Sequence, residues 1–135
     1  PFAASTLGET LLAPTIIYVN TVRELAAAVS IHGIAHITGG GLVENLPRVL
    51  PDDACAIIDS QSWQRPEIFS WLQEQGKVEE LEMMRTFNCG IGMVLCVPQE
   101  HSELALELLN REEESAYLIG QIESRSGDAE AVRFK

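Results

Sequence analysis

The sequence predicts a single domain of the α+β class, in which a mixed β-sheet carries helices on its faces. Its length of 135 residues suffices for one hydrophobic core. A hydrophobic content of 46% against 21% charged residues argues against disorder. Short β-branched or apolar runs alternate with helical patterns, and the last two strand patterns follow each other directly.

The first third of the chain predicts a strand, a helix and a second strand. Residues 15–19 are a β-branched run typical of a strand. The sequence Thr21-Val-Arg-Glu24 has the spacing of a capping box and predicts a helix, and residues 31–38 predict the second strand. This order suits a compact parallel crossover. Residues 1–14 are interpreted as an arm or linker from an upstream domain, which leaves 15–135 as the domain itself.

The next elements are punctuated by proline and glycine. Residues 42–50 predict a short helix that Pro47 bends or ends early, because proline has no backbone N–H to donate. Residues 54–59 predict a strand. Residues 66–75 predict a helix that begins with proline, and Gly76 is expected to stop it.

A second helix, a strand and a third helix are expected after that point. Residues 78–85 predict the second helix, and the unbroken apolar run 93–97 predicts a central strand. In the helix expected over 101–110, Leu104 and Leu108 are predicted to face inward.

The C-terminal part predicts two strands. Residues 117–123 and 131–134 are the strand patterns, and a turn at Gly127-Asp128 is expected to join them into a hairpin. The glutamates at 112–114 predict a solvated turn rather than a metal site.

The charge and the cysteines limit the class of partner and the compartment. A net charge of −11 opposes nucleic acid or an anionic membrane as a partner. The chain has no apolar run near ~20 residues and no signal-peptide pattern, so a cytoplasmic protein is expected. The odd number of cysteines and the absence of a CxxC motif predict reduced, buried thiols at Cys55 and Cys96, with Cys89 partly accessible in a loop.

Three consecutive glycines, Gly39, Gly40 and Gly41, stand between a predicted strand and a predicted helix. Glycine is used where the backbone bends sharply or approaches another group closely. At a helix start, free N–H groups can bind an anion, most often a phosphate. A tight turn without a ligand explains the pattern equally well, and no named nucleotide-binding motif is matched.

Two other features could contribute to a site. His32 and His36 are four apart in a strand pattern, which places them too far apart to share a metal. His36 could face a bound ligand or transfer a proton, although a core histidine bonded to a backbone carbonyl is the favoured alternative. Asn88-Cys-Gly-Ile-Gly92 predicts a tight loop, either functional or a plain turn. No metal-binding spacing is found in the sequence.

Four stretches resemble the C-terminal half of the phosphoribosylformylglycinamidine cyclo-ligases, also called aminoimidazole ribonucleotide synthetases. The resemblance lies in His36-Ile-Thr-Gly-Gly-Gly-Leu-Val-Glu-Asn-Leu-Pro-Arg-Val-Leu-Pro51 and Arg85-Thr-Phe-Asn-Cys-Gly-Ile-Gly-Met93. It also includes Leu12-Ala-Pro-Thr15 and residues 63–71, and extends over about 11–122. It implies a three-layer α/β/α arrangement with partial likeness to the ferredoxin-like fold.

The resemblance implies a step of purine biosynthesis. ATP activates the amide oxygen of formylglycinamidine ribonucleotide, and an amine closes the imidazole ring with loss of ADP and phosphate. In this family an N-terminal domain holds most ligands of ATP and Mg²⁺ and forms a homodimer. The present chain would then be inactive without that domain.

The resemblance also implies roles for particular residues. Thr38, Gly39, Gly40 and Gly41 match a family loop that faces the cleft between domains, which implies contact with phosphate. Asn88, Gly90 and Gly92 are expected near the same cleft, and the role of His36 stays open. The alternative is a freestanding module that binds a phosphorylated small molecule, or interacts with a partner, through the same glycine loop.

Overall fold

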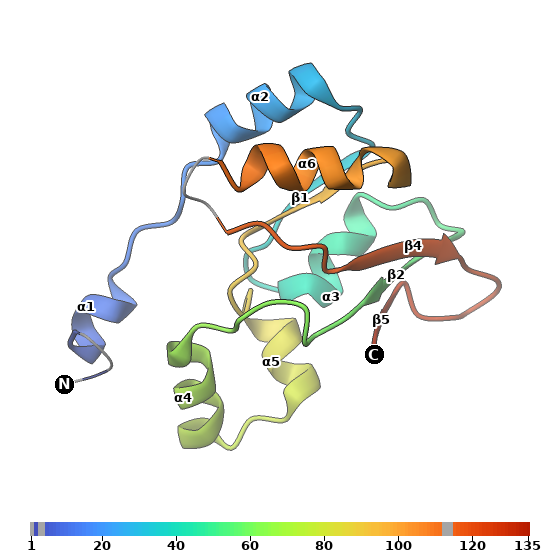
Figure 1. Ribbon diagram of the computed structural model, residues 1–135. Helices are drawn as coiled ribbons and strands as arrows, with labels where there is room; N and C mark the ends of the chain where they lie inside the picture. Colours follow the sequence, from blue (N-terminus) through green and yellow to red (C-terminus); the bar gives the residue numbers. More distant parts are fainter. Residues whose placement is uncertain (1, 3–4, 112–114) are drawn as a thin grey trace.

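The computed structural model describes residue 2, residues 5–111 and residues 115–135 (Figure 1). It confirms the α+β class, with helices packed around two small sheets. The α-helices are α1 Leu7–Leu11, α2 Val19–Ala28, α3 Gly41–Asn45, α4 Glu67–Gly76, α5 Glu80–Thr86 and α6 Ser102–Leu109. The strands are β1 Gly33–His36, β2 Ala54–Ile58, β3 Met93–Cys96, β4 Gly120–Ser124 and β5 Val132–Phe134. Two 3-10 turns, η1 Leu46–Arg48 and η2 Gln99–His101, complete the described elements.

Strands β1 and β3 form an antiparallel ribbon in which His36 lies opposite Met93. Leu95 on one face of the ribbon packs with residues of α2 and α6, among them the buried Leu25. Ala35 on the other face belongs to the larger core that α3 and α5 also build. The ribbon therefore lies between two helical layers, in the order α/β/α that the resemblance implies (Figure 1).

The second sheet is mixed, as predicted, and β2 is its central strand. It pairs antiparallel with β4 and parallel with β5. The predicted hairpin of the last two strands is wrong, because β4 and β5 lie on opposite edges of β2. Arg125 explains the crossing: its backbone N–H donates to the carbonyl of Asp53 at 2.6 Å and its Nε to the carbonyl of Asp52 at 3.1 Å. These bonds turn the chain around the start of β2 before β5 begins.

The strand predicted over 15–19 is also wrong. Residues 13–18 have no regular secondary structure, and α2 already begins at Val19. A β-branched run becomes a strand only beside a partner strand, and within the described chain none pairs with it. The parallel crossover expected here is therefore absent from the described structure.

The capping box predicted at Thr21 is wrong, since that residue lies inside α2. A complete capping box occurs instead at the start of α1: the Glu9 N–H donates to the Thr6 hydroxyl at 3.2 Å, and the Glu9 carboxylate accepts from the Thr6 N–H at 3.0 Å. Residues 1–14 therefore contain a short helix, while their role as a link to an upstream domain stays a prediction.

Proline acts as predicted in the segment after the glycines. Helix α3 ends at Asn45, and Pro47 lies in the 3-10 turn η1 that continues it. The helix that follows Pro66 ends differently from the prediction: Gly76 remains inside α4, and Lys77 supplies the left-handed residue with φ 50°. The helix predicted over 78–85 is confirmed as α5, and that over 101–110 as α6.

Two predictions are wrong about how elements are placed in the fold: the inward face of the helix over 101–110, and the central position of the strand over 93–97. Leu104 is 42% exposed rather than inward, because Ala105 and Leu108 form the face of α6 that packs on α2. Strand β3 is not central, since it pairs with β1 alone in the described structure. The glutamates at 112–114 lie outside the described residues.

Candidate functional site

The glycine loop follows the last residue pair of the β1–β3 ribbon. The backbone N–H of Ile37 donates to the carbonyl of Gly92 at 2.9 Å, which extends the ribbon by one bond. Thr38 then begins a turn in which its carbonyl accepts from the N–H of Gly41 at 3.0 Å. Thr38 and Gly39 are exposed and Gly40 is half-buried. The N–H groups of Gly39 and Gly40 donate no hydrogen bond within the described residues, so they are available to a ligand.

A different structural feature explains the glycine at each of the three loop positions. Gly39 has open space where a Cβ would stand. Gly40 has φ 100°, and its Cβ would approach the flexible side chain of Glu44 at 2.8 Å. A Cβ on Gly41 would overlap the carbonyl oxygen of Met84 and approach that of Phe87 at 2.7 Å. Gly41 therefore permits close packing of α3 on α5, whereas Gly39 has no packing role and Gly40 serves the left-handed turn.

The buried side chain of Asn45 hydrogen-bonds to backbone carbonyls of the glycine loop. This residue is 5% exposed, and its Nδ2 donates to the carbonyl of Gly41 at 2.8 Å and to that of Gly39 at 3.3 Å. Its Oδ1 accepts from Arg48 at 3.2 Å. The side chain thus occupies two loop carbonyls, whereas the N–H groups of Gly39 and Gly40 have no acceptor among the described residues. The sequence prediction missed this residue.

His36 lies at the same end of the ribbon. The structure excludes the favoured interpretation as a core histidine, because this residue is exposed. Its ring lies 6.2 Å from that of Tyr18, centroid to centroid, at an interplanar angle of 68°. A Cβ on Gly92 would collide with the Tyr18 hydroxyl, which explains the glycine there. The structure thus brings together His36, the loop from Thr38 to Gly41, and Gly92.

The loop before β3 is a tight turn closed by its own backbone. The N–H of Ile91 donates to the carbonyl of Asn88 at 2.9 Å, and Asn88 Oδ1 accepts from the N–H of Gly90 at 3.0 Å. Cys89 and Gly90 have φ of 50° and 102°, so the strained non-glycine position is the cysteine rather than the asparagine. A Cβ on Gly90 would lie only 2.5 Å from the Pro66 ring, so the turn packs closely against that proline.

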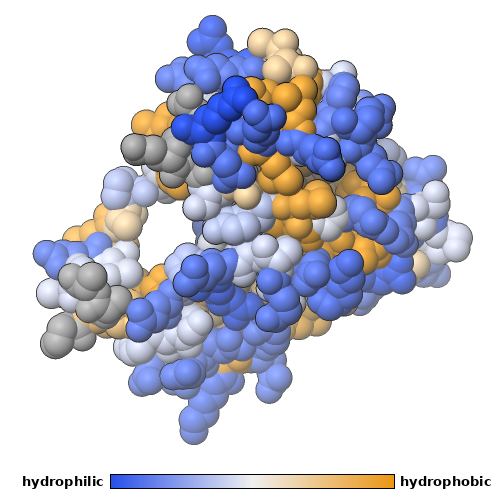
Figure 2. Space-filling model, in the orientation of Figure 1, coloured by the Kyte–Doolittle hydropathy of each residue, from blue (hydrophilic) through white to orange (hydrophobic). Residues whose placement is uncertain are grey.

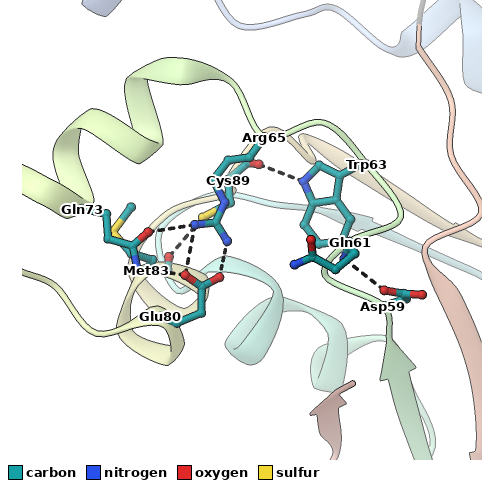
Figure 3. Close-up of polar contacts among 8 residues, drawn as sticks. All are labelled: Asp59, Gln61, Trp63, Arg65, Gln73, Glu80, Met83 and Cys89. Carbon is teal, nitrogen blue, oxygen red and sulfur yellow. Dashed lines mark hydrogen bonds and ion pairs between the residues drawn. The ribbon is translucent and has the colours of Figure 1, made fainter.

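A tryptophan fixes this turn from a distant part of the chain. The indole Nε1 of Trp63 donates to the carbonyl of Cys89 at 3.0 Å, and both residues are buried (Figure 3). Cys89 is fully buried, which corrects the expectation that it is partly accessible. Burial raises the pKa of its thiol, and that of Cys96 as well, so neither has the thiolate character of a nucleophile.

An ion pair beside the turn joins the segment after Trp63 to α5. The guanidinium of Arg65 makes a two-pronged contact with the Glu80 carboxylate and donates to Gln73 Oε1 at 3.1 Å (Figure 3). The hydrogen bond from Arg65 lowers the pKa of Glu80, and Glu80 in turn raises the pKa of Arg65. Together with Gln73 of α4, which also donates to the Glu80 carboxylate at 2.9 Å, the pair connects α4 and α5.

Two hollows of the structure lie away from the glycine loop. A hollow of about 220 Å³ between α2 and α6 includes Thr21 and Leu109, and another of about 150 Å³ includes Cys55 and Arg133. Neither contains a residue of the glycine loop. Among the described residues no group of three or more His, Cys, Asp or Glu side chains is placed to hold a metal ion. Nor is any helix in the described part of the chain long and apolar enough to span a bilayer.

Sequence comparisons agree with the resemblance noted from the motifs. The family model described as "AIR synthase related protein, C-terminal domain" matches residues 1–133. The chain is 54% identical over 134 residues to a phosphoribosylformylglycinamidine cyclo-ligase from Nitrosococcus oceani, a match that covers 99% of this chain. The chain spans 37% of the length of that relative. This protein chain therefore belongs to the family of AIR synthase related proteins and corresponds to their C-terminal domain.

Proposed function

We propose that this chain is the C-terminal half of a phosphoribosylformylglycinamidine cyclo-ligase, which closes the imidazole ring of aminoimidazole ribonucleotide in purine biosynthesis. The observation that carries the proposal is the 54% identity to a cyclo-ligase over 99% of the chain. The chain corresponds to 37% of that relative and matches a C-terminal domain, so an upstream portion is proposed to supply the rest of the enzyme. A cytoplasmic location fits this function.

The glycine loop is proposed to contact a phosphate group of the substrate or of ATP. The N–H groups of Gly39 and Gly40, which have no acceptor among the described residues, support this role, because backbone amides bind anions without a positively charged side chain. Such donors suit a chain with a net charge of −11, which offers few cations for the task. Helix α3 has only five residues, so the loop amides rather than a long helix dipole supply the attraction.

The ring closure divides between the two halves of the enzyme. ATP supplies the phosphoryl group that activates the amide oxygen, and its Mg²⁺ ligands are proposed to lie mostly in the upstream half. The present chain orients an anionic group through Thr38, Gly39 and Gly40, and places His36 beside it. His36 is exposed and next to the loop, so it can exchange a proton with a bound substrate. Asn88, Gly90 and Gly92 are proposed to border the same cleft.

Ring closure by a chimera tests this function. The upstream portion of the Nitrosococcus oceani cyclo-ligase is fused to the start of this chain, and ADP release with formylglycinamidine ribonucleotide is measured. We expect activity in the chimera and none in the present chain alone. Activity of the chain alone would contradict the division of the site, and an inactive, folded chimera would contradict the cyclo-ligase function. Phosphate binding by the chain alone, beside an inactive chimera, would support the freestanding module.

A substitution in the chimera tests the loop. Gly40→Val opposes the left-handed backbone at φ 100° and brings its side chain against Glu44, and we expect at least about a tenfold loss of kcat/KM. Gly127→Val is the control, since Gly127 also has positive φ, at 60°, in a turn with nothing within 4 Å of a Cβ. Equal activity of the two variants would contradict phosphate contact by the loop.

The oligomeric state is a separate part of the proposal. The full-length enzyme is proposed to be a homodimer formed through its upstream half. Sedimentation of the present chain should then give a monomer, and sedimentation of the chimera a dimer. A tight dimer of the present chain would place an interface in this half.

A further inference from the structure

Tyr18 is the residue at which the N-terminal segment joins the body of the domain. Residues 11–17 are exposed, and in the ribbon view they and α1 lead away from the body, with a gap between the two in the space-filling view (Figures 1 and 2). Tyr18 is half-buried and directly precedes α2, and its carbonyl accepts from the N–H of Val22 at 2.9 Å. The first turn of α2 therefore fixes the backbone from which the Tyr18 ring extends.

The ring of Tyr18 meets the imidazole of His36 edge-on. The two ring centroids are 6.2 Å apart, and the interplanar angle is 68°. This arrangement is favourable for aromatic rings, because the positive edge of one faces the negative face of the other. The His36 side chain is exposed, and within the described part of the chain it makes no hydrogen bond. The contact with Tyr18 is therefore the specific interaction that the structure gives for orienting this imidazole.

Gly92 makes room for the Tyr18 hydroxyl. A Cβ on Gly92 would overlap the hydroxyl oxygen and would lie 3.1 Å from Cζ of the same ring. Gly92 is not among the glycines with positive φ, so its backbone conformation does not require glycine. The close approach of Tyr18 is instead what excludes a side chain there. Because the Gly92 carbonyl accepts from the N–H of Ile37 at 2.9 Å, Tyr18 lies across both strands at the end of the ribbon.

We propose that Tyr18 is a positioning residue for His36, and that its ring holds the imidazole in the orientation from which His36 exchanges a proton with substrate. This inference rests on the proposed function, which assigns that proton exchange to His36. Only Ile37 separates His36 from Thr38, so rotation of the imidazole moves its nitrogen atoms relative to a group bound at the glycine loop. In this role Tyr18 acts through His36 and not on the substrate. Restricting the rotamers of a proton-transfer group reduces the entropy lost on reaching the reactive geometry.

Nuclear magnetic resonance of the present chain measures the contact directly. The chain has three histidines, so the imidazole signals of His32 and His101 serve as internal references. Tyr18→Leu removes the aromatic ring and its ring current, and should shift the imidazole signals of His36 and average its side-chain couplings over several rotamers. Tyr18→Phe keeps the ring and should leave both nearly unchanged. Unchanged His36 signals in Tyr18→Leu would overturn the inference.

The chain offers a matched control for the loss of a tyrosine ring. It has two tyrosines, and the other one, Tyr117, is 39% exposed. Tyr117→Leu should leave the His36 signals unchanged, and the signals of His32 and His101 should stay in place in every variant as evidence of a retained fold. A His36 shift of equal size in Tyr117→Leu would show that the effect is not specific to Tyr18 and would overturn the inference.

A second pair of variants approaches the contact from the other strand. In Gly92→Ala the new methyl group would overlap the Tyr18 hydroxyl, so the ring must move and the His36 signals should shift. Tyr18→Phe removes that oxygen, and Cζ, the next ring atom, is 3.1 Å from the Cβ position. Gly92→Ala combined with Tyr18→Phe should therefore return the His36 signals toward their original positions. Equal shifts with and without Tyr18→Phe would show that Tyr18 does not transmit the change, and would overturn the inference.

Kinetics of the chimera with the Nitrosococcus oceani upstream portion test the consequence for ring closure. Tyr18→Leu should lower kcat by at least about tenfold and change KM by less than about threefold, because the orientation of His36 affects the chemical step more than substrate binding. Tyr18→Phe should restore most of the lost kcat, and Tyr117→Leu should leave kcat unchanged. An unchanged kcat in Tyr18→Leu would contradict a role of Tyr18 in the reaction.

The positioning role and the proposed function fail in different ways. If the unsubstituted chimera does not close the ring, the proposed function fails, while the resonance measurements on the present chain still decide whether Tyr18 orients His36. If the chimera is active and Tyr18→Leu changes neither the His36 signals nor kcat, the function stands and the positioning role is wrong.

Discussion

The indole Nε1 of Trp63 donates a hydrogen bond of 3.0 Å to the carbonyl oxygen of Cys89, 26 residues further along the chain. Both groups are buried. Cys89 occupies a left-handed backbone conformation that is costly for a residue with a Cβ, and the bond from Trp63 helps to hold it there. The turn that leads into β3 is therefore fixed by a residue that precedes α4.

Trp63→Phe should destabilise the fold by about 1–3 kcal/mol, because the Cys89 carbonyl loses its donor while it remains buried. The free energy of unfolding from urea denaturation measures the effect. Trp71→Phe is the control: Trp71 is only half-buried, and its ring contacts Phe2 edge-on. Equal losses in the two variants would show that ring volume rather than the hydrogen bond matters at Trp63.

Gly41→Ala should destabilise the fold by more than about 2 kcal/mol, since its methyl group would overlap the Met84 carbonyl and the φ of 56° disfavours a side chain. Gly39→Ala should leave the thermal midpoint nearly unchanged, because open space surrounds that position. Thermal unfolding of both variants gives the comparison. A stable Gly41→Ala variant would contradict the close packing of α3 on α5.

Asn45→Ala should cost about 1–3 kcal/mol, because the carbonyls of Gly39 and Gly41 lose the amide that satisfies them. The exposed Asn110 also bonds backbone groups, to Leu106 and Ala116, so Asn110→Ala is a matched control with a smaller expected loss. Denaturant titration measures both. In the chimera, Asn45→Ala should also lower activity. A loss of stability with unchanged activity would contradict the role of Asn45 in presenting the loop.

The ion pair of Arg65 and Glu80 predicts a particular dependence on pH. Its hydrogen bond lowers the folded-state pKa of Glu80 below the unperturbed value of about 4.3. The pair therefore stabilises the fold above that pH, and its contribution is lost as the pH falls through the folded-state pKa. Because the pair is partly exposed, the contribution is at most about 1 kcal/mol.

Glu80→Gln tests this dependence. The difference in unfolding free energy between the unsubstituted chain and this variant should be largest near neutral pH and should decrease as the pH falls through the lowered folded-state pKa of Glu80. Glu82→Gln is the control, since the pair of Glu82 with Arg85 is within one helix and exposed on both sides. A difference for Glu80→Gln that does not change with pH would contradict the assignment.

Local patterns predicted the elements that neighbouring residues decide. The apolar run of β2 and the helix α6 were predicted from the sequence, and Pro47 ends α3 as expected because a missing N–H acts locally. The strand over 15–19 and the terminal hairpin failed for one reason. Both depend on which strand lies alongside, and that partner is decided by distant contacts such as those of Arg125.

The candidate site likewise contains residues that local sequence predicts and residues that only folding brings together. The three glycines and the loop at residues 88–92 can be recognised from their residue types alone. The motifs around them identified the family. Asn45, Tyr18 and Trp63 were missed, because each acts through a side chain that reaches backbone or rings brought near by folding. The quoted motif contains Asn45, so its place four residues after Gly41 was the available signal.

The sequence by itself determined the α+β class, the family, and the loops that could meet a ligand, since these follow from local periodicity, glycine content and motif identity. Only the tertiary structure decided that β1 and β3 place His36, the glycine loop and Gly92 at one end of a ribbon. It alone showed that Gly41 is required for packing whereas Gly39 is not. The physical reason is that close contacts and hydrogen-bond partners arise between residues far apart in the chain, and composition does not record which of them meet.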